Sequence, residues 1–198
     1  MSSKAEITLT EHGNRYLRSK NYNYNFHGKT GAFIRWGKTE KEIPKWAPFG
    51  PEFLYIDLSD ETTHMSFDIF KKILDVMPKT LTSIIFEIHF PMELSDLNKI
   101  FEHCKWNYIM PVVVMNDVTK LLNLPDYVHR CSDHNIMLSH SGLFDAFIDC
   151  NGVFRVSSDK PPLVDYVADV TSINDFAKEI WLNDQMLKWR EENYGIRK

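Results

Sequence analysis

The pattern of apolar and polar positions begins with a strict alternation near the N-terminus. Residues 21–26 alternate asparagine with an aromatic residue, residues 27–31 (HGKTG) have the composition of a turn, and residues 32–36 form a second strand-like run. This pattern predicts a β-hairpin. Residues 1–20 are polar apart from one strand-like run, ITLT, and we expect them to form an N-terminal arm.

The middle of the chain alternates strand-like and helix-like segments. Three mostly apolar runs have the length of buried strands, namely residues 53–58, 83–89 and 109–115. Between them, residues 66–77 and 94–106 place apolar side chains at helical spacing, with Ser66 and Ser95 as the expected N-caps. Strands joined through helices run parallel, and three of them do not close a barrel. The pattern therefore predicts an open sheet with a parallel βαβαβ core.

The pattern weakens after Leu124. Residues 135–138 have the composition of a short strand, and residues 144–149 and 153–156 flank Cys-Asn-Gly as a second hairpin. A loop is expected over residues 157–166. A final helix is expected from about Ile173, with Ser172 as N-cap and Asp175 completing a capping box.

The expected fold class is α/β: a small open sheet with the parallel βαβαβ core, plus N-terminal and C-terminal hairpins and a C-terminal helix. After the arm of residues 1–20, residues 21–198 are expected to form a single domain. Its parts are the hairpin and connector (21–50), the βαβαβ core (51–125) and the C-terminal hairpin and helix (126–198).

Composition excludes several classes of protein. The 198 residues are 43% hydrophobic and 25% charged, as in ordinary globular proteins, with a net charge of −4. No long basic run is present, so nucleic-acid binding is not favoured. The sequence contains no apolar stretch that could span a bilayer and no signal-peptide pattern, so we expect a cytoplasmic protein. The three cysteines form no CxxC pair, and we expect free thiols.

Four polar residues are candidates for a pocket at the ends of the predicted strands. Asp57 ends the first strand, and His64 lies in the loop that follows it. Glu87 and His89 alternate along the second strand, so both side chains point to one face. Ligands gather at the carboxyl ends of parallel strands, where these groups could perform acid–base or metal-assisted chemistry. The alternative interpretation is a solvated loop for His64 and a mutually satisfied pair for Glu87 and His89.

Other chemical motifs are weak. The run HRCSDHNIMLSH contains His129, Cys131, His134 and His140, but their spacing is irregular for a closed zinc site. No phosphate-binding loop, GxSxG or HExxH motif occurs. The five tryptophans are expected in the core or over sheet edges. We therefore assign no catalytic, cofactor-binding or metal-binding residue, and no cofactor.

Two blocks of the sequence resemble a family of phage and bacterial proteins. The first contains NFHGKTGAFIRWGKT, then PFGPEFLYIDLS, then MSFDIFKKILDVMPKTLTSIIFEI; the second contains GLFDAFIDCNGVFRVSS and INDFAKEIWLNDQMLKWREE. Together they resemble the opening and the C-terminal region of radical S-adenosylmethionine (radical SAM) proteins. The resemblance implies a partial radical-SAM-type barrel and an association with phages.

The departures from that family determine the expected function. The family holds a [4Fe–4S] cluster through CxxxCxxC after the first strand, but residues 59–64 are SDETTH and contain no cysteine. The second strand ends in EIHFP without the family's glycine, and several βα units are missing between Asn123 and Asn135. We therefore expect a shortened, non-catalytic relative that binds a protein, either a host or defence protein or a second copy of itself. The alternative is a small hydrolase or metal-dependent enzyme.

Overall fold

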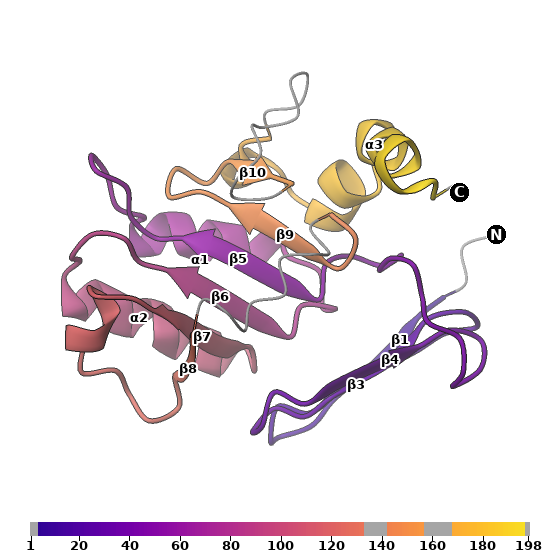
Figure 1. Cartoon of the computed structure of the whole chain (residues 1–198), viewed down its shortest axis with the longest axis horizontal. Helices are drawn as coiled ribbons and strands as arrows, with labels where there is room; N and C mark the ends of the chain where they lie inside the picture. Colours follow the sequence, from indigo (N-terminus) through magenta and orange to yellow (C-terminus); the bar gives the residue numbers. More distant parts are fainter. Residues whose placement is uncertain (1–3, 133–141, 157–167, 197–198) are drawn as a thin grey trace.

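The computed structural model describes residues 4–132, 142–156 and 168–196, which form two β-sheets and helices around the larger sheet (Figure 1). The smaller sheet has four antiparallel strands in the order β1-β2-β3-β4. The larger has six strands in the order β10-β9-β5-β6-β7-β8, and every pairing is parallel except that of β10 with β9. The predicted α/β class is confirmed.

The small sheet combines the predicted hairpin with residues that were expected to form an arm. Its strands are β1 (Glu6–Leu9), β2 (Arg15–Arg18), β3 (Asn23–Phe26) and β4 (Phe33–Trp36). Strands β3 and β4 are the predicted hairpin. The strand-like run ITLT overlaps β1, as predicted, whereas the arm prediction is wrong for β2, because β2 pairs with β3 and buries Leu17 completely. Strand β2 has only four residues and an arginine at each end, so its sequence shows no clear alternation of apolar and polar residues.

The large sheet contains the predicted parallel core. Its elements are β5 (Phe53–Asp57), α1 (Phe67–Val76), β6 (Ser83–Glu87), α2 (Leu94–Trp106), β7 (Met110–Met115), β8 (His129–Ser132), β9 (Asp145–Ile148) and β10 (Phe154–Arg155). Helices α1 and α2 lie side by side on one face of the sheet (Figure 1). Leu54, Ile56, Ile84 and Phe86 are fully buried in the main core. A second cluster contains Tyr55, Ile85, Val114 and Phe147. Side chains alternate between the two faces of a strand, so this cluster lies on the face of the sheet opposite the main core.

The N-cap predictions provide a matched pair for a stability test. Ser66 caps α1, since its Oγ accepts from the backbone N–H of Ile69. The cap of α2 is Glu93, without a side-chain hydrogen bond, so the prediction of Ser95 is wrong. We expect Ser66→Ala to lower the free energy of unfolding by about 1 kcal/mol and Ser95→Ala to change it little, as measured by urea denaturation. Equal losses in the two variants would contradict this assignment of the caps.

The C-terminal region differs from the predicted single helix. A 3-10 turn, η4 (Val170–Ser172), precedes a π-helix, η5 (Ala177–Trp181), and then α3 (Asp184–Tyr194). The prediction of Ser172 as N-cap is wrong, because its hydroxyl donates to the carbonyl of Asp169, whereas Asn183 caps α3. The predicted C-terminal hairpin is present as β9 and β10. The predictions for residues 135–138 and 157–166 lie outside the described residues.

The two sheets meet at Glu52, which immediately precedes β5. The hydroxyl of Tyr22 and Nη2 of Arg35 both donate to the carboxylate of Glu52, the latter at 2.5 Å. The hydroxyl of Tyr24 donates to the carbonyl of Thr80 at 2.9 Å, before β6. Contacts from Tyr22, β3 and β4 thus hold the small sheet at the amino ends of the parallel strands, opposite their carboxyl ends.

Candidate functional site

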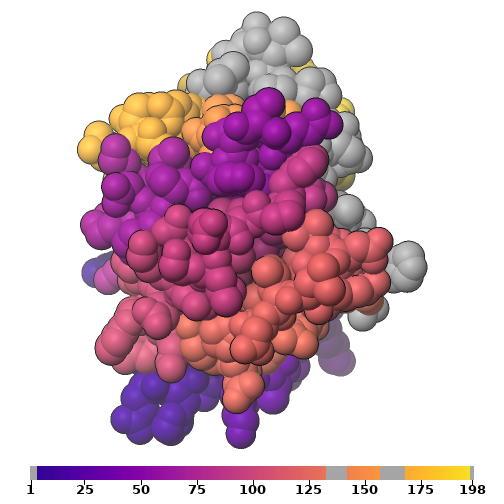
Figure 2. Space-filling view, turned by 90° about the vertical axis from the view of Figure 1, so that its left-hand side faces the viewer, coloured from indigo at the N-terminus to yellow at the C-terminus, as the bar shows by residue number. Residues whose placement is uncertain are grey.

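The carboxyl ends of β5 and β9 form the position at which open parallel sheets usually bind ligands. These strands are neighbours, but the chain leaves β5 through α1 towards β6 and leaves β9 through the hairpin to β10. Such a reversal of direction creates a crevice between the two departing loops. Figure 2 views the molecule from this side, where the loops that follow β5, β6 and β7 form the surface.

Three of the four predicted pocket residues lie together at this edge. Asp57 and Glu87 are register partners at the ends of β5 and β6, so their side chains lie on the same face. Nε2 of His89 lies 3.3 Å from Oε2 of Glu87, within reach of a hydrogen bond. Partial burial raises the pKa of Asp57, while the N–H of Ser59 and the nearby His89 oppose that rise. A carboxylate–histidine group is therefore assembled from two strands.

His64 does not join this group among the contacts of the described residues. It is exposed and forms an isolated β-bridge with Ser59, which closes the loop into a small hairpin. Oδ1 of Asp60 accepts the backbone N–H groups of Thr62 and Thr63 at 2.7 and 2.8 Å. The exposure of His64 agrees with the alternative interpretation of a solvated loop better than with a pocket residue.

The same loop is bound to the hairpin after β9 through Cys150. Sγ of Cys150 lies 3.2 Å from Oδ2 of Asp60. The N–H donors of Thr62 and Thr63, together with this thiol, lower the pKa of Asp60 to about 2, and the N–H of Thr62 contributes most. Burial and the adjacent carboxylates raise the pKa of Cys150 to about 12. Cys150 is therefore a neutral hydrogen-bond donor and not a nucleophilic thiolate or a ready metal ligand.

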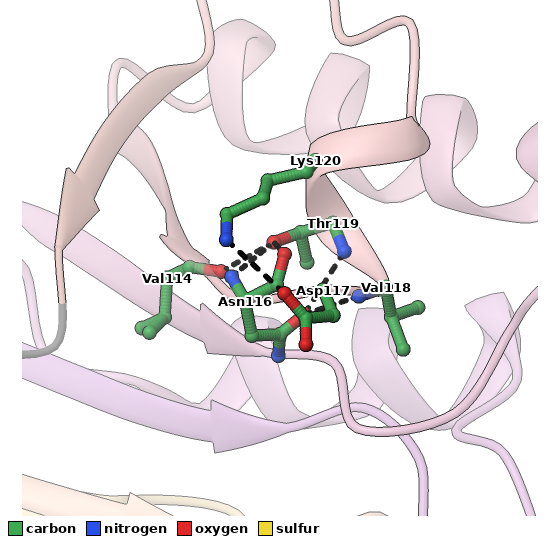
Figure 3. Close-up of polar contacts among 6 residues, drawn as sticks. All are labelled: Val114, Asn116, Asp117, Val118, Thr119 and Lys120. Carbon is green, nitrogen blue, oxygen red and sulfur yellow. Dashed lines mark hydrogen bonds and ion pairs between the residues drawn. The ribbon is translucent and has the colours of Figure 1, made fainter.

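The turn after β7 is closed by its own polar groups (Figure 3). Oδ1 of Asn116 accepts the N–H groups of Val118 and Thr119 at 3.0 and 2.9 Å, and Oγ1 of Thr119 donates to the carbonyl of Val114 at 2.9 Å. Nδ2 of Asn116 also donates to the carbonyl of Ile88, which connects this turn to the end of β6. These polar side chains stabilise the turn and are not presented to a ligand.

The loops after β6 and β9 use their polar groups in the same way. Oγ of Ser59 donates to the carbonyl of Phe90 and accepts its N–H, so the loops after β5 and β6 are bonded together. Oδ1 of Asp149 accepts the N–H groups of Asn151 and Val153, and its Oδ2 pairs with Arg155 at 3.0 Å. At this edge, most of the polar groups that could perform chemistry hold the loops in place.

A metal centre is not assembled among the residues that the structure describes. No group of three histidine, cysteine or acidic side chains there has an arrangement suited to a metal ion. His129 and Cys131 alternate along β8, whereas His134 and His140 lie outside the described residues. The three free thiols come from separate elements: Cys104 from α2, Cys131 from β8 and Cys150 from the β9 hairpin.

A large cavity lies at the opposite end of the sheet, between the small sheet and the end of α2. Its volume is about 580 Å³, and we call it the aromatic cleft. Its walls include four aromatic side chains, three basic ones and two acidic ones, namely Phe26, Trp106, Tyr108, Tyr127, His12, Lys105, His129, Glu11 and Glu102. A cavity of this size is within the range of ligand-binding sites.

Apolar surface is unusually exposed at the aromatic cleft. The side chain of Trp106 is 80% exposed and that of Tyr108 is 44% exposed. The ammonium group of Lys105 lies 4.6 Å from the ring centroid of Tyr127 on the cleft wall. Exposed aromatic residues around a concave surface are characteristic of sites that bind other molecules.

A buried arginine lies behind the wall of the aromatic cleft. Arg15 is 5% exposed, and its β-sheet register partner Phe26 lines the cleft. Its Nη2 donates to the carbonyl of Tyr108 at 3.4 Å, while its Nη1 is buried without a partner. Burial lowers the pKa of Arg15, and the nearby Tyr24 opposes this effect. The cleft therefore has a positive charge beneath an aromatic surface.

The position of Trp106 in the sequence of α2 indicates an exposed tryptophan, a signal that the predictions from the sequence did not use. The apolar stripe of α2 consists of Leu97, Ile100, Phe101 and Cys104, all fully buried. Trp106 lies off this stripe, at a position where the helical pattern predicts solvent exposure. The prediction that the tryptophans lie in the core or over sheet edges holds for the fully buried Trp181 and is wrong for Trp106.

Comparisons with family models, curated proteins and solved structures give no match to this chain. Among the described residues, no helix is both long and apolar enough to cross a bilayer. The carboxyl edge and the aromatic cleft are the two candidate functional sites of this chain.

Proposed function

We propose that this chain is a non-catalytic protein-binding module on a shortened radical-SAM-type scaffold, and that the aromatic cleft is its recognition surface. The observation that carries the proposal is Trp106, a large side chain left 80% exposed beside a 580 Å³ cavity. Burying a large apolar side chain stabilises a protein by roughly 2–3 kcal/mol. The exposed Trp106 does not contribute this free energy to the folded chain. A partner that covers Trp106 would recover this free energy.

The carboxyl edge supports the non-catalytic part of the proposal. A radical-SAM-type site would require a thiolate-rich loop after β5, and the loop present is closed by Asp60 and bonded to Cys150. Asn116 and Asp149 likewise hold their own turns. The family resemblance associates the chain with phages, and we propose a host or defence protein in the host cytoplasm as the partner.

The charge beneath the cleft indicates the chemistry of the partner. Arg15 has no acidic contact among the described residues, and its charge is weakly screened because it is buried. Glu11 and Glu102 also line the cleft, but both are exposed, and Glu11 lies 3.5 Å from His12. A partner that presents a large apolar side chain next to a carboxylate would complement this surface.

The test is capture of the partner from host cytosol by tagged wild-type protein and by two variants with matched exposure. We expect Trp106→Ala to weaken capture at least tenfold, because central aromatic residues commonly contribute more than 1.4 kcal/mol to an interface. Leu121→Ala removes a side chain that is 87% exposed but lies in η1 (Thr119–Leu121), away from the cleft, and should bind normally.

The outcomes of this experiment separate the alternatives. A partner captured equally well by Trp106→Ala would rule out the aromatic cleft as the interface. Recovery of a second copy of the chain would replace the host partner with a homo-oligomer.

A second candidate function uses the carboxyl edge as a small hydrolase or metal-dependent site. It is favoured by the 3.3 Å contact between Glu87 and His89 beside Asp57, which could act as an acid–base pair. These residues do not line the aromatic cleft. Metal analysis of the purified protein and ester or phosphoester hydrolysis that disappears in His89→Ala would support this candidate over the binding module.

A further inference from the structure

A buried arginine in α3 is held between two tryptophan rings. Arg190 is fully buried, and its guanidinium carbon lies 4.6 Å from the ring centroid of Trp46 and 4.3 Å from that of Trp181. Its Nε donates to the carbonyl of Gly142 at 2.6 Å, and its Nη1 donates to the carbonyl of Trp181 at 2.7 Å. These contacts fix the guanidinium group in one orientation.

The charge of Arg190 is not neutralised by the described part of the chain. No acidic side chain there forms an ion pair with it, and its Nη2 is buried without a hydrogen-bond partner. Burial alone lowers the pKa of Arg190 to about 9, so the group remains a cation at neutral pH. A buried cation is unfavourable by several kcal/mol unless an anion or strong acceptor compensates it.

Arg190 lines a cavity of about 200 Å³ between Trp46 and the outer turns of α3. Lys188, Asp184 and Glu191 also line it, but these three side chains are exposed, whereas Arg190 is the buried member. Exposed charges are screened by water and salt, whereas the charge of the buried Arg190 is screened only weakly. The volume accommodates a small molecule and is below the range typical of nucleotide-sized or drug-sized ligands.

We propose that this cavity binds a small carboxylate, which accepts a hydrogen bond from Nη2 of Arg190. Nε and Nη1 already have protein acceptors, so Nη2 is the nitrogen that remains for a ligand. Nη2 is shielded from water in the structure, so binding requires a small displacement of the side chains that line the cavity. Lys188, whose ammonium group lies 3.7 Å from Oε1 of Glu192, adds a second positive charge to the cavity, whereas Asp184 and Glu191 disfavour ligands with several negative charges.

The test is a titration of the full chain with acetate at constant ionic strength, with chloride as the balancing anion. We expect a saturable shift of the Nε–H resonance of Arg190 in proton–nitrogen spectra, together with a change in tryptophan fluorescence. Lys188→Met should weaken acetate binding severalfold and Asp184→Asn should strengthen it, because both side chains line the cavity. Lys178→Met, an exposed position in η5 outside the cavity, is the matched control and should bind as the wild type does.

Two outcomes would overturn the proposal. One is an Arg190 resonance that does not respond to acetate, or that responds equally to chloride, which would leave Arg190 as a purely structural clamp. The other is saturable binding of inorganic phosphate without binding of acetate, which would exclude a carboxylate ligand. Neither outcome requires an Arg190 substitution, which would disturb the packing of Trp46 and Trp181.

Discussion

Replacing Gly50 with alanine is expected to lower the free energy of unfolding by about 3 kcal/mol or more. Gly50 has φ +128°, a conformation that side chains with a Cβ rarely adopt. An added Cβ would lie 2.5 Å from Cγ of Pro78 and 2.9 Å from Oγ1 of Thr80. Backbone strain and overpacking each contribute about 1–3 kcal/mol. Urea denaturation of the purified variant measures the loss.

Gly195 provides the control for the Gly50 variant. It also has a positive φ, +64°, but no atom lies within 4 Å of the position that a Cβ would take. We expect Gly195→Ala to cost only about 1 kcal/mol, the strain of the left-handed conformation. Comparable losses in the two variants would mean that packing against Pro78 and Thr80 does not constrain Gly50.

The order of strands and helices in the parallel core was predictable from the sequence because local features mark where each element begins and ends. The segment PFGPE directs the chain into β5, and long apolar runs such as residues 109–115 can satisfy their pattern only as buried strands. Ser66 and Pro78 mark the two ends of α1 by local hydrogen bonding and by the missing N–H of proline. Local chemistry therefore determined most of the parallel core.

Elements whose formation depends on distant partners were not predictable in this way. Strand β8 is an edge strand of four residues, HRCS, and pairs only because β7 offers a free edge. The break between η5 and α3 depends on Asn183, which caps the second helix inside a segment of continuous helical periodicity. The sequence indicates amphipathic character there but not where one helix stops.

The contacts within the candidate sites also differ in whether the sequence could predict them. The proximity of Asp57 and Glu87 follows from parallel register, so it was predictable once two neighbouring strands were assigned. The contact of Cys150 with Asp60 joins residues 90 positions apart, and the clamp around Arg190 joins α3 to Trp46. Such contacts depend on the order of strands in the sheet, which hydrophobic periodicity does not encode.

The junction between the two sheets is expected to make the protein less stable as the pH rises from about 4 to about 7, with little further change up to pH 8.5. Burial raises the pKa of Glu52 and of Asp145 to about 7, and Arg35 opposes the rise in both. An acid with a raised pKa binds its proton more tightly in the folded state, so its stabilisation is complete below the unfolded pKa, near 4. That stabilisation disappears as the pH rises through about 7, and the loss is on the order of 3 kcal/mol.

Asp145 is the better candidate for the protonated group. Glu52 accepts hydrogen bonds from Tyr22 and Arg35, which favour its charged form, whereas Oδ1 of Asp145 is buried without a partner. We therefore expect Asp145→Asn to remove most of the pH dependence and to stabilise the protein at pH 8.5. Glu52→Gln should instead destabilise it at every pH, because Arg35 loses its counter-ion. An unchanged slope in Asp145→Asn, measured by urea denaturation across this pH range, would assign the proton to Glu52 and reverse the roles of the two carboxyl groups.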